Sequence, residues 1–253
     1  MGFGAIVIGD EIMRGKRQDK HFAKLVALLG ARGLRLDWCE YLGDDRERLT
    51  ATLARTFAAD DVVFSFGGIG ATPDDHTRQC AAAALGVPLE LHREAEAQIR
   101  ARFGAETNAQ RLKMGEFPRG ASIIPNSYNR IPGFSVARHY FVPGFPVMAW
   151  PMIEWVLDTH YAHLFHMAPE ADASILVYGA AESTLTPLME AIESRFAPAR
   201  VFSLPSIGED GQRRHIELGV RGAPESVPPA MAAIESALDE MQIEWARPAS
   251  GER

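Results

Sequence analysis

A glycine-rich turn followed by two adjacent aspartates is the part of this sequence best suited to chemistry. Gly67, Gly68 and Gly70 follow the apolar run 62–66, and residues 74–85 have the composition of a helix. Glycine allows a positive φ and a close approach to a ligand, and a helix start presents N–H groups without intrahelical acceptors. The pattern predicts a phosphate-binding turn between a strand and a helix.

The residues that open this helix have two explanations. Thr72 fits the N-cap, Pro73 the first helical position, and Asp75 the third, where its carboxylate can bond back to the cap. Capping alone explains Asp75. The adjacent carboxylates of Asp74 and Asp75 would, however, repel a phosphate unless a divalent cation lay between them, and Mg²⁺ is commonly held by one or two carboxylates plus substrate phosphates. The spacing therefore favours a metal-assisted phosphate site.

Two further acids follow the first apolar run of the chain, residues 4–8. If this run and 62–66 are parallel strands, Asp10 and Glu11 emerge at the same sheet edge as the glycine turn. Asp10, Glu11, Asp74 and Asp75 could then converge on one cation. A solvated turn with acids near a helix start explains Asp10 and Glu11 without any function, and on these two residues alone it is the simpler explanation.

The elements that must position these residues alternate between strand and helix. Apolar runs at 4–8, 34–41 and 62–66 predict strands, and helical spacing predicts intervening helices capped by Asp19 and by Asp44 or Asp45. This alternation predicts a parallel sheet flanked by helices. Further along the chain we expect helices over 74–85 and 93–103, a strand at 122–124, a hairpin over 134–142 turning at Ala137-Arg138, and a rigid corner at 143–146 before an apolar helix.

The pattern breaks at residues 167–172, and a strand, helix, two strands, helix and strand follow. This βαββαβ order is that of a ferredoxin-like domain. The sequence therefore predicts an α/β domain over residues 1–168 and a small βαββαβ domain over 169–253.

Composition and charge limit the functional classes. With 47% apolar and 23% charged residues, the 253-residue chain can bury substantial cores. A net charge of −7 disfavours nucleic acid as a partner, because such binding depends on displacing counterions with Lys and Arg. The most apolar stretch, 140–157, is interrupted by three prolines, so we expect no membrane span. The start lacks a signal-peptide pattern, and the two cysteines match neither a disulfide framework nor a zinc spacing, so we expect a cytoplasmic protein.

Several motifs occur in a fixed order along the first two-thirds of the chain. They are Gly9-Asp10-Glu11-Ile12, Gly43-Asp44-Asp45, the signature at 67–77, Leu85-Gly86-Val87-Pro88-Leu89, Pro118-Arg119-Gly120-Ala121, Pro125-Asn126-Ser127, Pro132-Gly133-Phe134 and Pro143-Gly144-Phe145-Pro146. Together they resemble the molybdopterin-binding domain family of MoaB, Mog and gephyrin, and in particular its CinA-type (competence/damage-inducible protein A) branch. The chain departs from the family pattern at His21, Ala71 and Met148.

The resemblance implies a three-layer α/β domain that binds a pterin or nucleotide phosphate, and it implies that the chain self-associates. In the CinA-type branch it implies a divalent-metal-dependent pyrophosphatase acting on ADP-ribose or FAD. Two alternatives are adenylyl transfer to molybdopterin and binding without catalysis. The second domain is similar to the small domain that follows in CinA-type proteins, and no amidohydrolase domain is recognisable.

The site residues expected on this basis fall into three groups. We expect Asp74 and Asp75 to be catalytic, and Asp10, Glu11, Asp74 and Asp75 to hold Mg²⁺, Mn²⁺ or Co²⁺. The expected ligand-binding residues are Gly67, Gly68, Gly70, Thr72, Thr77, Asn126, Pro143 and Gly144.

Overall fold

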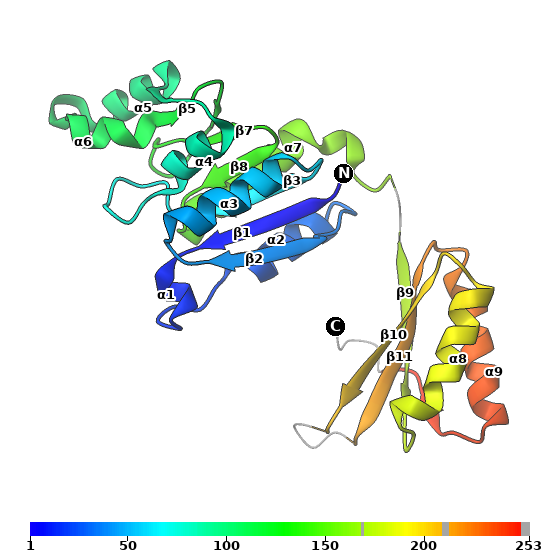
Figure 1. Cartoon of the computed structure of the whole chain (residues 1–253). Helices are drawn as coiled ribbons and strands as arrows, with labels where there is room; N and C mark the ends of the chain where they lie inside the picture. Colours follow the sequence, from blue (N-terminus) through cyan, green and yellow to red (C-terminus); the bar gives the residue numbers. More distant parts are fainter. Residues whose placement is uncertain (168–169, 209–212, 249–253) are drawn as a thin grey trace. The chain divides into compact units, whose positions relative to one another are not determined.

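The computed structural model describes residues 1–167, 170–208 and 213–248, and divides the chain into two compact units, Met1–Phe165 and His166–Arg253 (Figure 1). The predicted domain boundary, between residues 168 and 169, lies outside the described residues.

The first unit is built on a six-stranded sheet with the order β2-β1-β3-β8-β7-β6. β1, β2, β3 and β8 are parallel, whereas β7 runs antiparallel to both of its neighbours. The predicted parallel pairing is therefore confirmed for β2, β1, β3 and β8. The sheet is mixed at the edge formed by β7 and β6. The bounds are β1 Phe3–Ile8, β2 Trp38–Leu42, β3 Val62–Phe66, β6 Ser122–Ile124, β7 Gly133–Val136 and β8 His139–Val142.

Helices cover both faces of this sheet and make three layers (Figure 1). α2 (His21–Gly30) and α7 (Pro146–His160) pack on one face, and α3 (Arg46–Phe57) and α4 (Thr77–Leu85) on the other. The remaining elements of this unit are α1 Asp10–Met13, β4 Leu89–Leu91, α5 Arg93–Phe103, η1 Gly104–Glu106, α6 Ala109–Leu112, η2 Lys113–Gly115, β5 Glu116–Pro118 and η3 Ala162–Leu164.

Local signals explain several element ends. The Asp45 carboxylate accepts a hydrogen bond from Arg48 N–H at 2.8 Å and caps α3 as predicted. Asp19 accepts from the N–H groups of His21 and Phe22 and so fixes the start of α2. The predicted hairpin between β7 and β8 is confirmed. Its two turn residues, Ala137 and Arg138, both have positive φ, as a two-residue hairpin turn with the favoured twist requires.

The second unit has a four-stranded antiparallel sheet with the order β10-β11-β9-β12. With two helices, this is the split βαββαβ arrangement expected from the sequence. Its elements are β9 Ala171–Val177, α8 Glu182–Arg195, β10 Arg200–Ser206, β11 His215–Gly222, α9 Val227–Glu240 and β12 Trp245–Ala246. None of the helices within the described ranges has the length and apolar character needed to cross a membrane.

Candidate functional site

A cavity of about 450 Å³ lies where the chain leaves the carboxyl ends of β1, β3 and β8. Parallel sheets commonly bind ligands at this edge. We call it the acidic cavity, because the charged residues among its described lining are Glu11, Asp74 and Asp75. Its other lining residues are Gly68, Ile69, Gly70, Ala71, Thr72, Met114, Asn126, Asn129, Ile131, Pro132, Pro143, Gly144, Phe145 and Met148.

The glycine turn joins β3 to this cavity through a backbone that only glycine adopts easily. Gly67 has a φ of +102°, and a side chain there would collide with the carbonyl oxygen of Ile8 on β1. Gly67 N–H donates a hydrogen bond to the carbonyl oxygen of Val142 on β8. In contrast, the N–H groups of the next four residues, 68–71, donate to no acceptor in the described part of the chain. Buried or half-buried N–H groups normally have partners, so this run is suited to receive an anion.

The helix after the turn begins later than predicted, at Thr77 and not at Asp74. Thr77 N–H donates to the Gly68 carbonyl oxygen at 3.0 Å, and the Thr77 hydroxyl donates to that of Gly67 at 3.0 Å. These bonds tie the helix start to the end of β3, so residues 70–76 form a separate loop. Thr77 is therefore buried behind the turn and does not line the cavity.

Within that loop Thr72 and Asp75 close a turn of their own. Asp75 N–H donates to the Thr72 carbonyl oxygen, and the Asp75 carboxylate accepts from both the N–H and the hydroxyl of Thr72. The predicted bond between these residues exists, but it closes a loop and does not cap α4, whose N-cap is His76. Asp74 is exposed, and a hydrogen bond from the Thr72 side chain is the main cause that lowers the pKa of its carboxyl group.

The acids that follow β1 have separate roles. The Asp10 carboxylate accepts from Asp44 N–H at 3.2 Å and from the Arg14 guanidinium at 2.6 Å, and it does not line the acidic cavity. Glu11 does line it. The pKa of Asp44 is raised, first by burial and then by the negative charges of Asp10, Glu11 and Asp74. Asp10, Glu11 and Asp74 are therefore close enough to Asp44 to act on it electrostatically.

These acids do not form a ready-made metal centre. The described residues contain no group of three or more His, Cys, Asp or Glu side chains placed to hold an ion together. Glu11, Asp74 and Asp75 nevertheless line one cavity, and Mg²⁺ needs only one or two carboxylates when ligand phosphates and water supply its remaining ligands. The residues present fit a cation that arrives with a phosphate ligand.

Asn126 organises a second part of the cavity wall. It is 4% exposed, its amide nitrogen donates to Asn129 Oδ1 and to the Ile131 carbonyl oxygen, and its oxygen accepts from Tyr128 N–H. Asn129 Nδ2 in turn contacts the sulfur of Met148 at 3.2 Å. Asn126 thus positions the loop, and Asn129 is a cavity residue that the sequence analysis missed. Its only sequence signal is the second asparagine three residues after the first.

Nine of the twelve predicted site residues line the acidic cavity, and three do not. Those that line it are Glu11, Gly68, Gly70, Thr72, Asp74, Asp75, Asn126, Pro143 and Gly144. Gly67 and Thr77 lie behind it as structural supports, and Asp10 is held beside it by Asp44.

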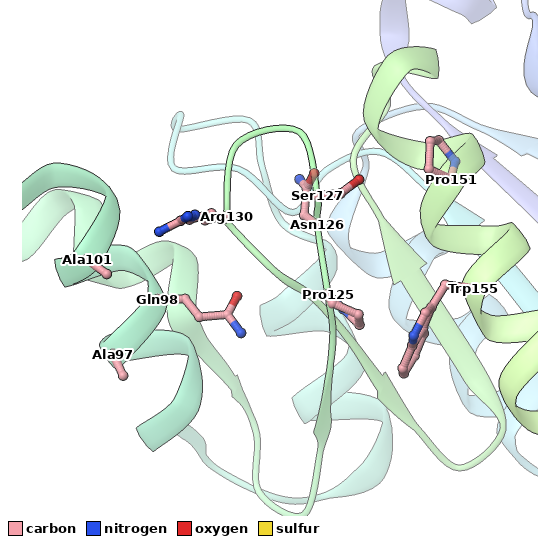
Figure 2. A pocket seen from close by; sticks show the side chains of 9 residues that line it. All are labelled: Ala97, Gln98, Ala101, Pro125, Asn126, Ser127, Arg130, Pro151 and Trp155. Carbon is pink, nitrogen blue, oxygen red and sulfur yellow. The ribbon is translucent and has the colours of Figure 1, made fainter.

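A larger but more open hollow of about 730 Å³, the open groove, lies on the other side of Asn126 (Figure 2). Figure 2 shows Gln98 of α5 and Arg130 on one side, Trp155 of α7 on the other, and Pro125 between them. Among the described residues that line it, Arg130 alone is charged. It has neither the run of free N–H groups nor the acids, so the acidic cavity is the better candidate.

Comparison with known proteins gives the same family as the sequence motifs. The model described as "Probable molybdopterin binding domain" matches residues 4–163. A CinA-like protein of Anaeromyxobacter sp. (strain K) is 38% identical over 160 residues, which cover 60% of this chain and 39% of that protein. Another, of Anaeromyxobacter sp. (strain Fw109-5), is 32% identical over 237 residues, covering 85% of this chain and 57% of that protein.

The chain thus matches between about two-fifths and three-fifths of the length of these curated relatives. The similarity to the second relative extends beyond the first unit, because 85% of the chain exceeds Met1–Phe165. Among solved structures, the protein CinA with unknown function from Thermoplasma acidophilum matches with a TM-score of 0.57 at 24% identity, covering 63% of this chain and 98% of that one. That likeness concerns the fold alone.

Proposed function

Because this chain belongs to the probable molybdopterin binding domain family, with CinA-like relatives, we propose that its acidic cavity binds the phosphate groups of a nucleotide or pterin. The observation that carries this proposal is the run of N–H groups at residues 68–71 without acceptors in the described chain. Phosphate oxygens would satisfy these donors. The carboxylates of Glu11 and Asp74 on the same cavity are the groups that would accept a cation brought by the phosphate.

The activity that fits this arrangement best is hydrolysis of a nucleotide pyrophosphate such as ADP-ribose or FAD. Residues 68–71 would hold the oxygens of one phosphoryl group, and Glu11, Asp74 and Asp75 would orient the attacking water. Water adds to one phosphorus and the bridging P–O bond breaks. Two phosphomonoesters, each with nearly two negative charges near pH 7, and two protons are released. A bound Mg²⁺, Mn²⁺ or Co²⁺ would supply Lewis-acid stabilisation of the charge that develops on the phosphoryl oxygens.

A specific observation favours the second candidate, which is binding without turnover. Asp74 and Asp75 both interact with Thr72, and Asp10 accepts from Asp44 and Arg14. Three of the four predicted metal-binding carboxylates therefore already have partners. Adenylyl transfer to molybdopterin is the other enzymatic candidate. Transfer consumes ATP and yields an adenylated pterin, whereas hydrolysis of ADP-ribose yields AMP and ribose phosphate.

The test is to incubate the chain with ADP-ribose or FAD and with Mg²⁺, Mn²⁺ or Co²⁺, and to identify the products by chromatography. We expect the unmodified chain to turn over the nucleotide. Asp74→Ala combined with Asp75→Ala should abolish this activity. Glu47→Ala combined with Glu94→Ala is the matched control, because it removes two negative charges from exposed helix positions of the same unit that do not line the cavity. Turnover that survives the Asp74 and Asp75 changes would remove both residues from the mechanism. Calorimetric binding of the nucleotide without products would instead support a binding module.

A further inference from the structure

A second hollow of about 310 Å³ adjoins the acidic cavity, and we call it the side cavity. The two cavities share Glu11, Gly144 and Phe145 as a common wall. The two cavities are therefore direct neighbours, on either side of these three residues. The volume of the side cavity is at the small end for ligand sites, which makes it suited to part of a ligand.

The inner wall of the side cavity is aromatic and fixed. The His21 ring stacks on Phe66, with centroids 4.5 Å apart and planes 23° from parallel. Its Nε2 donates to the carbonyl oxygen of Gly144 at 3.2 Å, which ties this wall to the wall shared with the acidic cavity. The other ring nitrogen, Nδ1, is buried and has no partner among the described groups. His21 is only 5% exposed, and burial lowers its pKa, so the ring is neutral near pH 7.

The outer wall carries two cations that are not neutralised by ion pairs. Arg17 and Lys20 both line the side cavity, and neither forms a salt bridge within the described ranges. Asp19 lies between them, but its oxygens accept from His21 N–H, Phe22 N–H and the Tyr41 hydroxyl. These bonds fix the Asp19 carboxylate at the start of α2, and it keeps its negative charge. The lining of the side cavity therefore includes Arg17 and Lys20 beside the carboxylates of Glu11 and Asp19, whereas the described lining of the acidic cavity includes no Arg or Lys.

We propose that the side cavity binds a second anionic group, a phosphomonoester, on the same ligand whose pyrophosphate lies against residues 68–71. The inference rests on the proposed function of the acidic cavity. A phosphomonoester carries nearly two negative charges near pH 7, so it matches two cations better than a carboxylate does. A guanidinium can bind it with two parallel hydrogen bonds, and an ammonium adds a point charge. The chain should therefore prefer dinucleotides with an extra phosphate.

Two ligand pairs that differ by one phosphate test this preference. NADP⁺ is compared with NAD⁺, and ADP-ribose 2′-phosphate with ADP-ribose, by calorimetric titration of the whole chain in Mg²⁺, with the intact ligand quantified afterwards. We expect the phosphorylated member of each pair to bind about tenfold tighter. In Arg17→Ala combined with Lys20→Ala that ratio should fall to about one, because affinity for the unphosphorylated members does not depend on these side chains.

Lys16→Ala is the matched control, because Lys16 is exposed, lies in the same loop and lines neither cavity, and it should keep the preference. Equal affinities within each pair for the unmodified chain would overturn the inference, as would a preference that survives the double change. Both outcomes leave NAD⁺ and ADP-ribose binding in place, so the proposed function would stand. If none of the four compounds bound, the proposed function would fail and the inference with it.

Discussion

Asp10 and Asp44 each accept a hydrogen bond from the backbone N–H of the other, at 3.2 and 2.9 Å respectively. This reciprocal pair joins the loop after β1 to the loop after β2. It also fixes the first residue of α1, the short helix that carries Glu11 to the acidic cavity. Asp10 therefore acts on the cavity by holding Glu11 in place.

We predict that Asp10→Ala lowers the unfolding free energy by about 1–3 kcal/mol, because it leaves the half-buried N–H of Asp44 without its acceptor. Asp10→Asn keeps an acceptor oxygen and should cost less than about 1 kcal/mol. Urea denaturation of the two variants measures the difference. Equal losses in both would show that the hydrogen bond is not what Asp10 contributes.

A second prediction separates Glu11 from Asp10 as a cation-binding group. Glu11→Gln should weaken the Mg²⁺-dependent binding of ADP-ribose about tenfold, since it removes a charge from the cavity wall. Asp10→Asn should change that affinity by less than about threefold, because Asp10 does not line the cavity. Titration calorimetry with and without Mg²⁺ provides the comparison, and a larger effect of Asp10→Asn would contradict these roles.

Gly67→Ala tests the close approach of β3 to β1. The new methyl group would meet the backbone carbonyl oxygen of Ile8, which cannot move without disturbing the sheet, and φ is +102°. We expect a loss of about 2 kcal/mol or more in unfolding free energy. Gly15→Ala is the matched control: its φ is +68°, but nothing lies within 4 Å of the new atom. The control should lose only about 1 kcal/mol, and similar losses in thermal or urea unfolding would refute the steric argument.

His139 makes stability depend on pH. It is fully buried, its Nδ1 donates to the Ala137 carbonyl oxygen, and burial lowers its pKa from 6.5 to about 4. In the unfolded chain the same ring takes up a proton near its ordinary pKa. The stability it contributes is therefore complete above about pH 6.5 and is lost as pH falls towards 4, by about 3 kcal/mol in total.

The measurement is the unfolding free energy as a function of pH for the unmodified chain and for His139→Gln, which does not titrate there. The difference between the two should shrink as pH falls from about 6.5 to 4. A pH profile unchanged by the substitution would mean that His139 is not the group responsible.

Much of the fold follows from local sequence signals. The predicted strands 62–66 and 122–124 and the helix 93–103 have the observed bounds. The start of α4 differs from the predicted one, because Thr77 is held by the carbonyl oxygens of Gly67 and Gly68. No local rule for helix caps includes bonds of that kind.

The candidate site was predictable to the extent that parallel strands bring their carboxyl ends together. That rule alone places Glu11 beside the glycine turn, and the structure agrees. It does not specify which way Asp10 faces, since this depends on Asp44 from another loop. Asn129 was missed because its place on the wall depends on the sulfur of Met148, 19 residues away in sequence, as well as on the nearby Asn126.

The most direct test of the central claim is to follow the backbone amides of the glycine turn by two-dimensional ¹H–¹⁵N NMR during titration with ADP-ribose and Mg²⁺. If phosphate oxygens take up the free N–H groups, the largest shifts should fall on Gly68, Ile69, Gly70 and Ala71. Saturable shifts centred on Trp155 and Arg130 of the open groove, with the turn unchanged, would contradict the account.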